Sequence, residues 1–214
     1  MLRENSHLAN RQNYDRLSHW YDSFSASERL ITQTGLTLLG AQPGEKILEI
    51  GFGTGHALIE LVHSVGETGL VCGIDLSPGM IGMARQHIQH IGNKGKIHLQ
   101  LGDATCLPFS SHQFQAIFIS FTLELFAENE IPVVLAECRR VLQHGGRLAI
   151  VSLLKNGSRS VMIYDWFHAR FPGIVDCRPI FVPQVLETAG FRTNNVVKKT
   201  LWGLPAAAII SSNP

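Results

Sequence analysis

The chain has 214 residues, enough for one generous domain or for one domain with a small appendage. Hydrophobic residues make up 45% of it and charged residues 16%, a balance that is typical of a packed core and excludes disorder over most of its length. The formal net charge of +1 provides no global field that could hold a nucleic-acid backbone or an anionic membrane, so a small ligand is favoured.

The first forty residues differ from the rest of the chain. Residues 1–40 carry aromatic side chains in a polar background and are predicted to form a helical lid over one edge of a sheet, whereas residues 41–214 are expected to form the main domain. The first ten residues contain no apolar stretch of the length that a secretory signal needs. No apolar run approaches the roughly 18 residues of a membrane span. We therefore expect a cytoplasmic protein without a membrane span.

From residue 46 onward, short apolar runs alternate with amphipathic stretches, which is typical of βαβ units and a parallel sheet. Seven strands are expected, at Lys46–Ile50, Leu70–Ile74, Ile97–Leu101, Gln115–Ser120, Arg147–Ser152, Phe191–Val197 and Ala206–Ser211. Helices are expected at residues 54–65, 78–91, 129–142 and 182–189, with an aromatic one within 155–180. Ser77 and Pro78 are typical of a helix start, and Gly145-Gly146 is expected to close the third helix.

The most informative motif is the glycine-rich loop Gly51–Gly55, which joins the first expected strand to the first helix. A loop at this place lies at the carboxyl edge of a parallel sheet, where doubly wound folds bind their ligands. Glycines there allow a sharp turn and close approach of a ligand, and the helix start behind them offers free N–H groups. His56 occupies the position where the dinucleotide fingerprint has glycine or alanine, which disfavours NAD and FAD.

Two aspartates follow the next two strands at the same edge. Asp75 comes 20 residues after Gly55, where a carboxylate can accept hydrogen bonds from both ribose hydroxyls, or can simply cap the helix that follows. Asp103 follows the third strand and is either a turn residue or an acceptor for the exocyclic amine of adenine, with the backbone of Ala104 at the ring edge. Signals after three successive strands together indicate a nucleoside-containing ligand.

The chain resembles the class I S-adenosylmethionine-dependent methyltransferases in five motifs within residues 43–195: ILEIGFGTG, CGIDLSPGM, GDATCLPF, AIFISF and RRVLQHGGRLAIVS. Leu107–Phe109 and Arg139–Gly146 are similar to the type 11 group, which includes the ubiquinone/menaquinone C-methyltransferases. The resemblance implies an α/β fold with a Rossmann-like, doubly wound sheet of seven strands in the order 3-2-1-4-5-7-6. One strand would be antiparallel to the others, and an N-terminal helical lid would cover the site.

The same resemblance implies S-adenosyl-L-methionine as the cofactor and a small-molecule methyl acceptor. The methionine part would lie in the glycine loop, Met80 would lie against the adenine, and Ser120 would face the methionine carboxylate or the sulfonium. The implied cofactor-binding residues are Glu49, Gly51, Gly53, Thr54, Gly55, Asp75, Leu76, Met80, Asp103, Ala104 and Ser120.

Methyl transfer is an in-line displacement in which the cofactor supplies the reactive group, so a protein base is optional. No spacing specifies such a base, and the candidates are His19, Tyr21, Tyr164 and His168. Further polar groups lie in regions that could cover the methyl group, at Glu124, Asp176 and Arg178. Asp176 and Arg178 either contact the acceptor or form a surface ion pair.

The stretch Phe121–Phe126 departs from the quinone-methylating relatives, which carry a basic-polar pair after the fourth strand. Here the stretch is more apolar and contains an acid, Glu124, which disfavours a quinone as the acceptor. The leading hypothesis is therefore methyl transfer to a small apolar or aromatic metabolite. An O-, N- or S-methyltransferase of another metabolite and a non-catalytic cofactor-binding module with the same fold are the alternatives.

Other classes of site lack support in the sequence. Ten histidines and four cysteines include no H-x-x-x-H pair around a glutamate and no C-x-x-C pair, so no metal is expected. Neither a basic face nor a base clamp indicates a nucleic-acid substrate. The pattern carries no indication of the oligomeric state.

Overall fold

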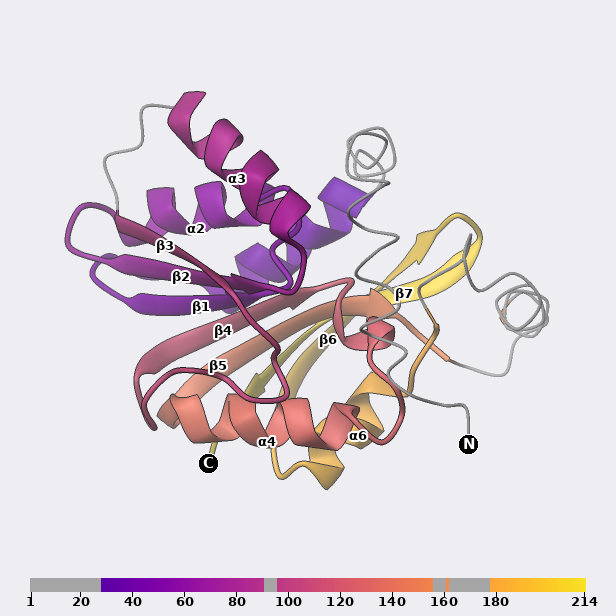
Figure 1. The fold of residues 1–214 in the computed structure, drawn as a ribbon. Helices are drawn as coiled ribbons and strands as arrows, with labels where there is room; N and C mark the ends of the chain where they lie inside the picture. Colours follow the sequence, from indigo (N-terminus) through magenta and orange to yellow (C-terminus); the bar gives the residue numbers. More distant parts are fainter. Residues whose placement is uncertain (1–27, 91–95, 156–160, 162–177) are drawn as a thin grey trace, which may run out of the picture.

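The computed structural model describes residues 28–90, 96–155, 161 and 178–214. Its centre is a seven-stranded sheet in the order β3-β2-β1-β4-β5-β7-β6 (Figure 1). Strands β1 to β5 pair in parallel, whereas β7 runs antiparallel to both of its neighbours, so the predicted order and the single antiparallel strand are confirmed. The strands are β1 Lys46–Ile50, β2 Leu70–Asp75, β3 Lys96–Leu101, β4 Phe114–Ser120, β5 Leu142–Leu153, β6 Arg192–Leu201 and β7 Leu204–Ser212.

Helices cover both faces of this sheet. The helix of residues 28–39, α2 (His56–Val65) and α3 (Pro78–His90) lie on one face, and α4 (Ile131–Val141) and α6 (Val182–Thr188) lie on the other (Figure 1). Successive strand residues point to opposite faces, so Ile47 packs into one apolar core and Leu48 into the other. Within the described ranges, no helix has the length and apolar character needed to cross a membrane.

The third predicted helix ends within one residue of its expected end at residue 142, but the expectation that Gly145-Gly146 closes it is wrong. Helix α4 ends at Val141, and Leu142 already has extended backbone and begins β5. Leu142 is fully buried and pairs with Phe114 of β4, so tertiary pairing determines the boundary before the glycines are reached. Gly145, with φ of 73°, instead lies inside β5, where its N–H donates to the Asn213 carbonyl oxygen at 2.7 Å.

The last two strands are longer than predicted. They form a hairpin whose tip is Trp202-Gly203, and β6 continues through Lys198 and Lys199 up to Leu201. These lysines interrupt the apolar pattern on which the prediction rested. Strand β6 is at the edge of the sheet, where exposed lysines are tolerated and discourage pairing with another chain.

The described part of the predicted lid packs on a face of the sheet rather than over its edge. In the helix of residues 28–39, Ile31 and Leu39 are buried in the core beside β4 and β5. Gly35 makes the closest approach, because a Cβ there would collide with the Val151 side chain and would lie 3.1 Å from the Phe118 ring. Residues 1–27 of the predicted lid lie outside the described residues.

Gly82 permits a direct test of helix propensity. It lies exposed inside α3, and a Cβ there would meet none of the described atoms within 4 Å. We expect Gly82→Ala to raise the free energy of unfolding by about 0.5–1 kcal/mol, because alanine loses less conformational entropy in a helix. Urea denaturation measures the change.

Gly66 provides the matched control for this substitution. Its surroundings are equally open among the described residues, but it ends α2 with φ of 66° and ψ of −165°, a conformation that essentially only glycine adopts. Gly66→Ala should therefore lower the free energy of unfolding. Changes of the same sign in the two variants would contradict the assignment of these backbone conformations.

Candidate functional site

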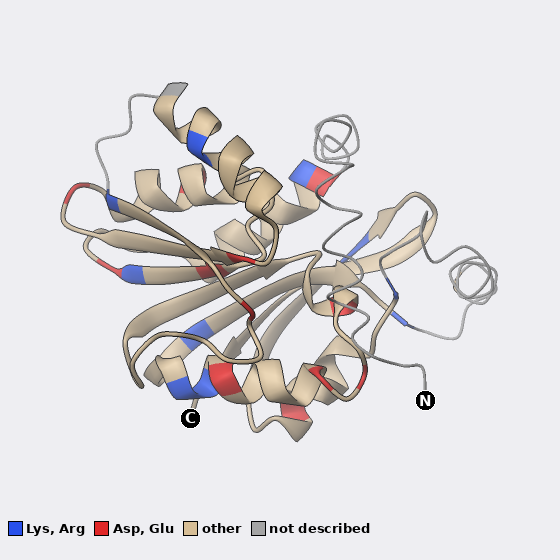
Figure 2. Ribbon diagram, viewed as in Figure 1, with Lys and Arg blue, Asp and Glu red and all other residues tan. Residues whose placement is uncertain are grey.

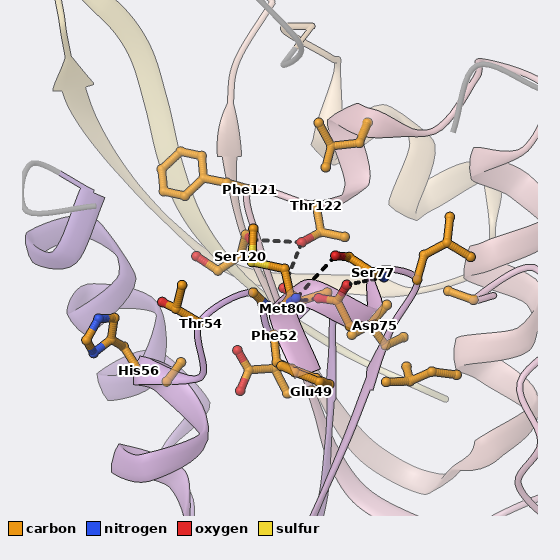
Figure 3. Close-up of a pocket in the computed structure, with 18 of the residues that line it drawn as sticks. Glu49, Phe52, Thr54, His56, Asp75, Ser77, Met80, Ser120, Phe121 and Thr122 are labelled. Carbon is orange, nitrogen blue, oxygen red and sulfur yellow. Dashed lines mark hydrogen bonds between the residues drawn. The ribbon is translucent and has the colours of Figure 1, made fainter. Parts of the chain in front are cut away.

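A pocket lies at the carboxyl edge of β1, β2 and β4 (Figure 3). Its walls come from the ends of these strands, the glycine loop, the start of α3 and the first turn of the helix of residues 28–39. Every predicted cofactor-binding residue except Gly55 lines it. The parallel strands therefore bring together side chains that are far apart in the sequence.

The three loop glycines share left-handed backbone, with φ of 69° at Gly51, 52° at Gly53 and 86° at Gly55. Gly51 faces Thr122, whose side chain a Cβ would strike, whereas a Cβ at Gly53 would meet nothing described within 4 Å. A Cβ at Gly55 would lie 2.9 Å from the Ala84 Cβ. Gly55 thus permits close packing of α2 against α3 instead of lining the pocket.

Asp75 joins the glycine loop to the start of α3. Its Oδ2 accepts a hydrogen bond from the Gly53 N–H and its Oδ1 accepts one from the Ser77 N–H, each at 2.9 Å. The cap of α3 is Ser77, whose Oγ accepts a hydrogen bond from the Met80 N–H at 3.2 Å. The carboxylate of Asp75 is consequently fixed in place on the pocket wall.

Glu49 is the most unusual group in the pocket. Its side chain is 2% exposed, and its Oε2 has no hydrogen-bond partner among the described residues. Burial, with a smaller contribution from the negative charge of Asp75, raises the pKa of Glu49 well above its usual range. A buried carboxylate oxygen without a donor is costly, so this position favours a ligand that brings a donor or a positive charge.

The predicted site residues Asp103 and Ala104 follow β3. Asp103 makes the turn expected of it, because its Oδ1 accepts a hydrogen bond from the Thr105 N–H at 2.9 Å, and it also lines the pocket. Ala104 and Met80 are buried and also line the pocket. The turn interpretation and a ligand contact are therefore compatible.

The end of β4 forms the other wall. Ser120 Oγ and Thr32 Oγ1 are 3.0 Å apart and hydrogen-bonded, and Thr122 Oγ1 donates to the Ser120 and Gly51 carbonyl oxygens. Phe121, between them, has φ of 48°, which is a strained conformation for a bulky residue. In the view of Figure 3 its ring lies beyond Ser120 and Thr122, away from Glu49. Strain of this kind often marks a functional site.

Several pocket residues were not predicted from the sequence as site residues. Phe121, Leu125 and Phe126 give one part of the pocket an apolar lining, and Glu28 and Thr32 reach it from the helix of residues 28–39. Burial raises the pKa of Glu28 to about 7. The only signal in the sequence is the spacing of four between Glu28 and Thr32, which places them on one helix face.

The predicted catalytic candidates are mostly outside the described residues, which is the case for His19, Tyr21, Tyr164, His168 and Asp176. Arg178 does not line the pocket and forms an ion pair with Glu128, with Nη1 and Oε1 2.8 Å apart. Glu124 lies in the short 3-10 helix η1 (Leu123–Leu125) next to the pocket, with 2% of its side chain exposed.

Charged side chains of both signs are interspersed along the described ribbon (Figure 2). Among the described residues, no three or more histidine, cysteine, aspartate or glutamate side chains form a group that could hold a metal ion. The pocket itself contains both Arg29 and the acids Glu28, Glu49, Asp75 and Asp103. Its chemistry is therefore that of a mixed polar and apolar cavity for an organic ligand.

Comparisons with known proteins agree with this architecture. Residues 47–146 match the sequence model of the Methyltransferase domain family. The ubiquinone/menaquinone biosynthesis C-methyltransferases UbiE of Klebsiella pneumoniae and Escherichia fergusonii are each 29% identical to the chain over 160 residues. These matches cover 69% of the chain but 63% of each relative, so the chain spans less than two thirds of their length.

The solved structures point to the same fold. The crystal structure of a SAM-dependent methyltransferase from Aquifex aeolicus superposes with a TM-score of 0.71 at 23% identity, covering 94% of this chain and 98% of that one. The sheet order, the antiparallel β7 and the glycine loop after β1 define the class I methyltransferase fold. The chain is therefore similar to the class I S-adenosylmethionine-dependent methyltransferases in fold and sequence, and residues 47–146 are the part that matches the Methyltransferase domain model.

Proposed function

We propose that this protein transfers the methyl group of S-adenosylmethionine to a small molecule with an apolar body. The observation that carries this proposal is the buried Glu49 carboxylate, whose Oε2 lacks a partner among the described residues beside an open glycine loop. The ammonium group of the cofactor would satisfy this oxygen. A neutral cofactor fragment without a donor would leave it unpaired.

The remaining residues on this side fit the rest of the cofactor. Asp75 is held by two amide donors at the end of β2, where its carboxylate would also accept hydrogen bonds from the ribose hydroxyls. Met80 and Ala104 provide apolar contacts for the adenine, and Asp103 an acceptor for its amine. Ser120 would lie near the methionine end. When bound, the cofactor supplies an activated methyl group.

The chain's own contribution is to orient the acceptor and to exclude water. Phe121, Leu125 and Phe126 form the apolar part of the pocket, which favours an acceptor with an aromatic or aliphatic body. The hydrogen bond between Thr32 and Ser120 attaches the helix of residues 28–39 to β4 beside this region. Alignment of acceptor and methyl group is worth on the order of 7–11 kcal/mol in such a displacement.

Calorimetric titration with S-adenosylmethionine tests the cofactor assignment. We expect saturable heat with a one-to-one ratio, and no heat with NAD, because His56 replaces the last small residue of the dinucleotide motif. Absence of heat with S-adenosylmethionine at high micromolar concentration would contradict the proposal. Labelled methyl transfer to a metabolite panel then separates an enzyme from a module that only binds the cofactor.

Ring C-methylation of a quinol is the second candidate. The similarity to the two UbiE relatives favours it. The apolar stretch Phe121–Phe126, with its buried Glu124, differs from the pattern in quinone-methylating relatives and weighs against it. Quinols therefore belong in the same metabolite panel.

A further inference from the structure

Two carboxyl groups lie next to the apolar part of the pocket, and the cofactor assignment uses neither of them. Glu28 lines the pocket one helical turn before Thr32. Glu124 is 2% exposed in η1, with its Oε1 accepting a hydrogen bond from the Leu153 N–H at 3.2 Å. Its Oε2 has no hydrogen-bond partner among the described residues.

The two groups interact electrostatically. Burial is the main cause that raises the pKa of Glu124 to about 7, and the negative charge of Glu28 adds to it. Burial raises the pKa of Glu28 to about 7. Near neutral pH this part of the pocket thus carries carboxyl groups that can hold or release a proton.

Their charge restricts the acceptor. A phenolate, enolate or thiolate would meet negative charge from Glu28 and Glu124 in a region of low polarity, which costs energy. An ammonium group would instead be attracted by both charges and could donate a charge-assisted hydrogen bond to the Glu28 carboxylate, which lines the pocket. The apolar residues Phe121, Leu125 and Phe126 would contact the rest of such an amine.

We propose that the acceptor is a primary or secondary amine with an apolar body, that Glu28 binds its ammonium group and takes up a proton from it, and that the buried Glu124 influences the ionisation of Glu28 electrostatically. This inference rests on the proposed methyl transfer and specifies its substrate class. Glu28 is the catalytic residue because it lines the pocket, whereas Glu124 acts through it.

The carboxylate of Glu28 takes one proton from the ammonium group, which leaves a neutral amine with a free electron pair. A bond forms from nitrogen to the methyl carbon, and the carbon–sulfur bond breaks with its electrons on sulfur. The product is a methylated ammonium ion and a neutral thioether, and Glu28 returns its proton to water.

The pH dependence follows from the ionisation of Glu28. The carboxylate form accepts the proton, so kcat/KM for an amine should rise as the pH increases through about 7. The other described charged or titratable groups on the pocket wall are Arg29, Glu49, His56, Asp75 and Asp103. We call this rise of kcat/KM with pH the pH limb. Because His56 also lines the pocket, the limb is assigned to Glu28 only if a Glu28 variant loses it.

The test compares Glu28→Gln with Glu60→Gln, an exposed control on α2 that is outside the pocket. The full-length chain is assayed with labelled S-adenosylmethionine and 2-phenylethylamine, with 4-ethylphenol and an alkylated hydroquinone as matched acceptors. We expect labelled amine only. Glu28→Gln should lower kcat about a hundredfold or more and remove the pH limb, with cofactor binding retained, while Glu60→Gln changes neither.

Glu124→Gln tests the electrostatic interaction between Glu124 and Glu28. Removing a neighbouring negative charge makes Glu28 easier to ionise, so the pH limb should move to lower pH while cofactor binding is unchanged. A merely structural role would lower activity without moving the limb.

The outcomes separate the two proposals. Failure to bind S-adenosylmethionine would overturn the proposed function. Binding with transfer only to the phenol or hydroquinone, or a Glu28→Gln variant within about twofold of the wild type, would overturn the amine assignment alone. Binding without transfer to any acceptor would contradict both the amine assignment and catalysis.

Discussion

Replacement of Asp75 by alanine is expected to raise the Kd for S-adenosylmethionine by about a hundredfold or more. Two hydrogen bonds to the ribose would be lost, and each charge-assisted bond contributes about 1.5–3 kcal/mol. The change also leaves the Gly53 and Ser77 amides without their carboxylate acceptor, so the loop loses an anchor. Calorimetric titration measures the Kd.

Two further variants show whether the effect is specific. Glu67→Ala removes an exposed acid outside the pocket and should leave the Kd unchanged. Asp75→Asn keeps an acceptor but removes the charge, so its Kd should lie between those of the wild type and Asp75→Ala. An unchanged Kd for Asp75→Ala would reject the ribose assignment.

The second large effect is expected from Gly51→Ala. Left-handed backbone costs an alanine about 1–2 kcal/mol. The new Cβ would also strike the Thr122 side chain and disturb its hydrogen bonds to the Gly51 and Ser120 carbonyl oxygens. We expect the free energy of unfolding to fall by about 2–3 kcal/mol in total, together with weaker cofactor binding. Urea denaturation of the unliganded protein measures the stability.

Gly53→Ala is the matched control for this collision. Its φ is also left-handed, but the space around it is open among the described residues, so only the conformational cost applies in the unliganded protein. Introducing Thr122→Ala together with Gly51→Ala should recover part of the lost stability, because the colliding atoms are removed. Equal losses of unfolding free energy in Gly51→Ala and Gly53→Ala would contradict a collision between the new Cβ at residue 51 and the Thr122 side chain.

The parallel part of the fold was predictable because its signals are local. Buried strands such as Lys46–Ile50 are short apolar runs bounded by turn residues, and a helix start such as Ser77-Pro78 has a specific chemistry. The strand order came from the resemblance to a family, since no local pattern reports which strands are neighbours. The role of Gly145-Gly146 was mispredicted because pairing of Leu142 with Phe114 ends α4 before the glycines are reached.

The residues of the site also differ in how well the sequence predicts them. Residues such as Glu49, Asp75 and Asp103 were predictable because each follows or ends a parallel strand, and all such ends meet at one edge. Glu28 was not predictable, because its place in the pocket depends on how the helix of residues 28–39 packs on β4 and β5. The left-handed backbone of Phe121 likewise has no signal in its residue type.

The close contact of Gly35 with the sheet has a consequence for the size of the acceptor. Glu28, Thr32 and Gly35 lie on one face of a single helix, so the depth at which Gly35 packs also determines how far the other two reach into the cavity. A methyl group at residue 35 would push the helix outward from Val151 and Phe118 and widen the space before the methyl donor. Relatives of this chain could thus acquire bulkier substrates by changing a residue that touches no ligand.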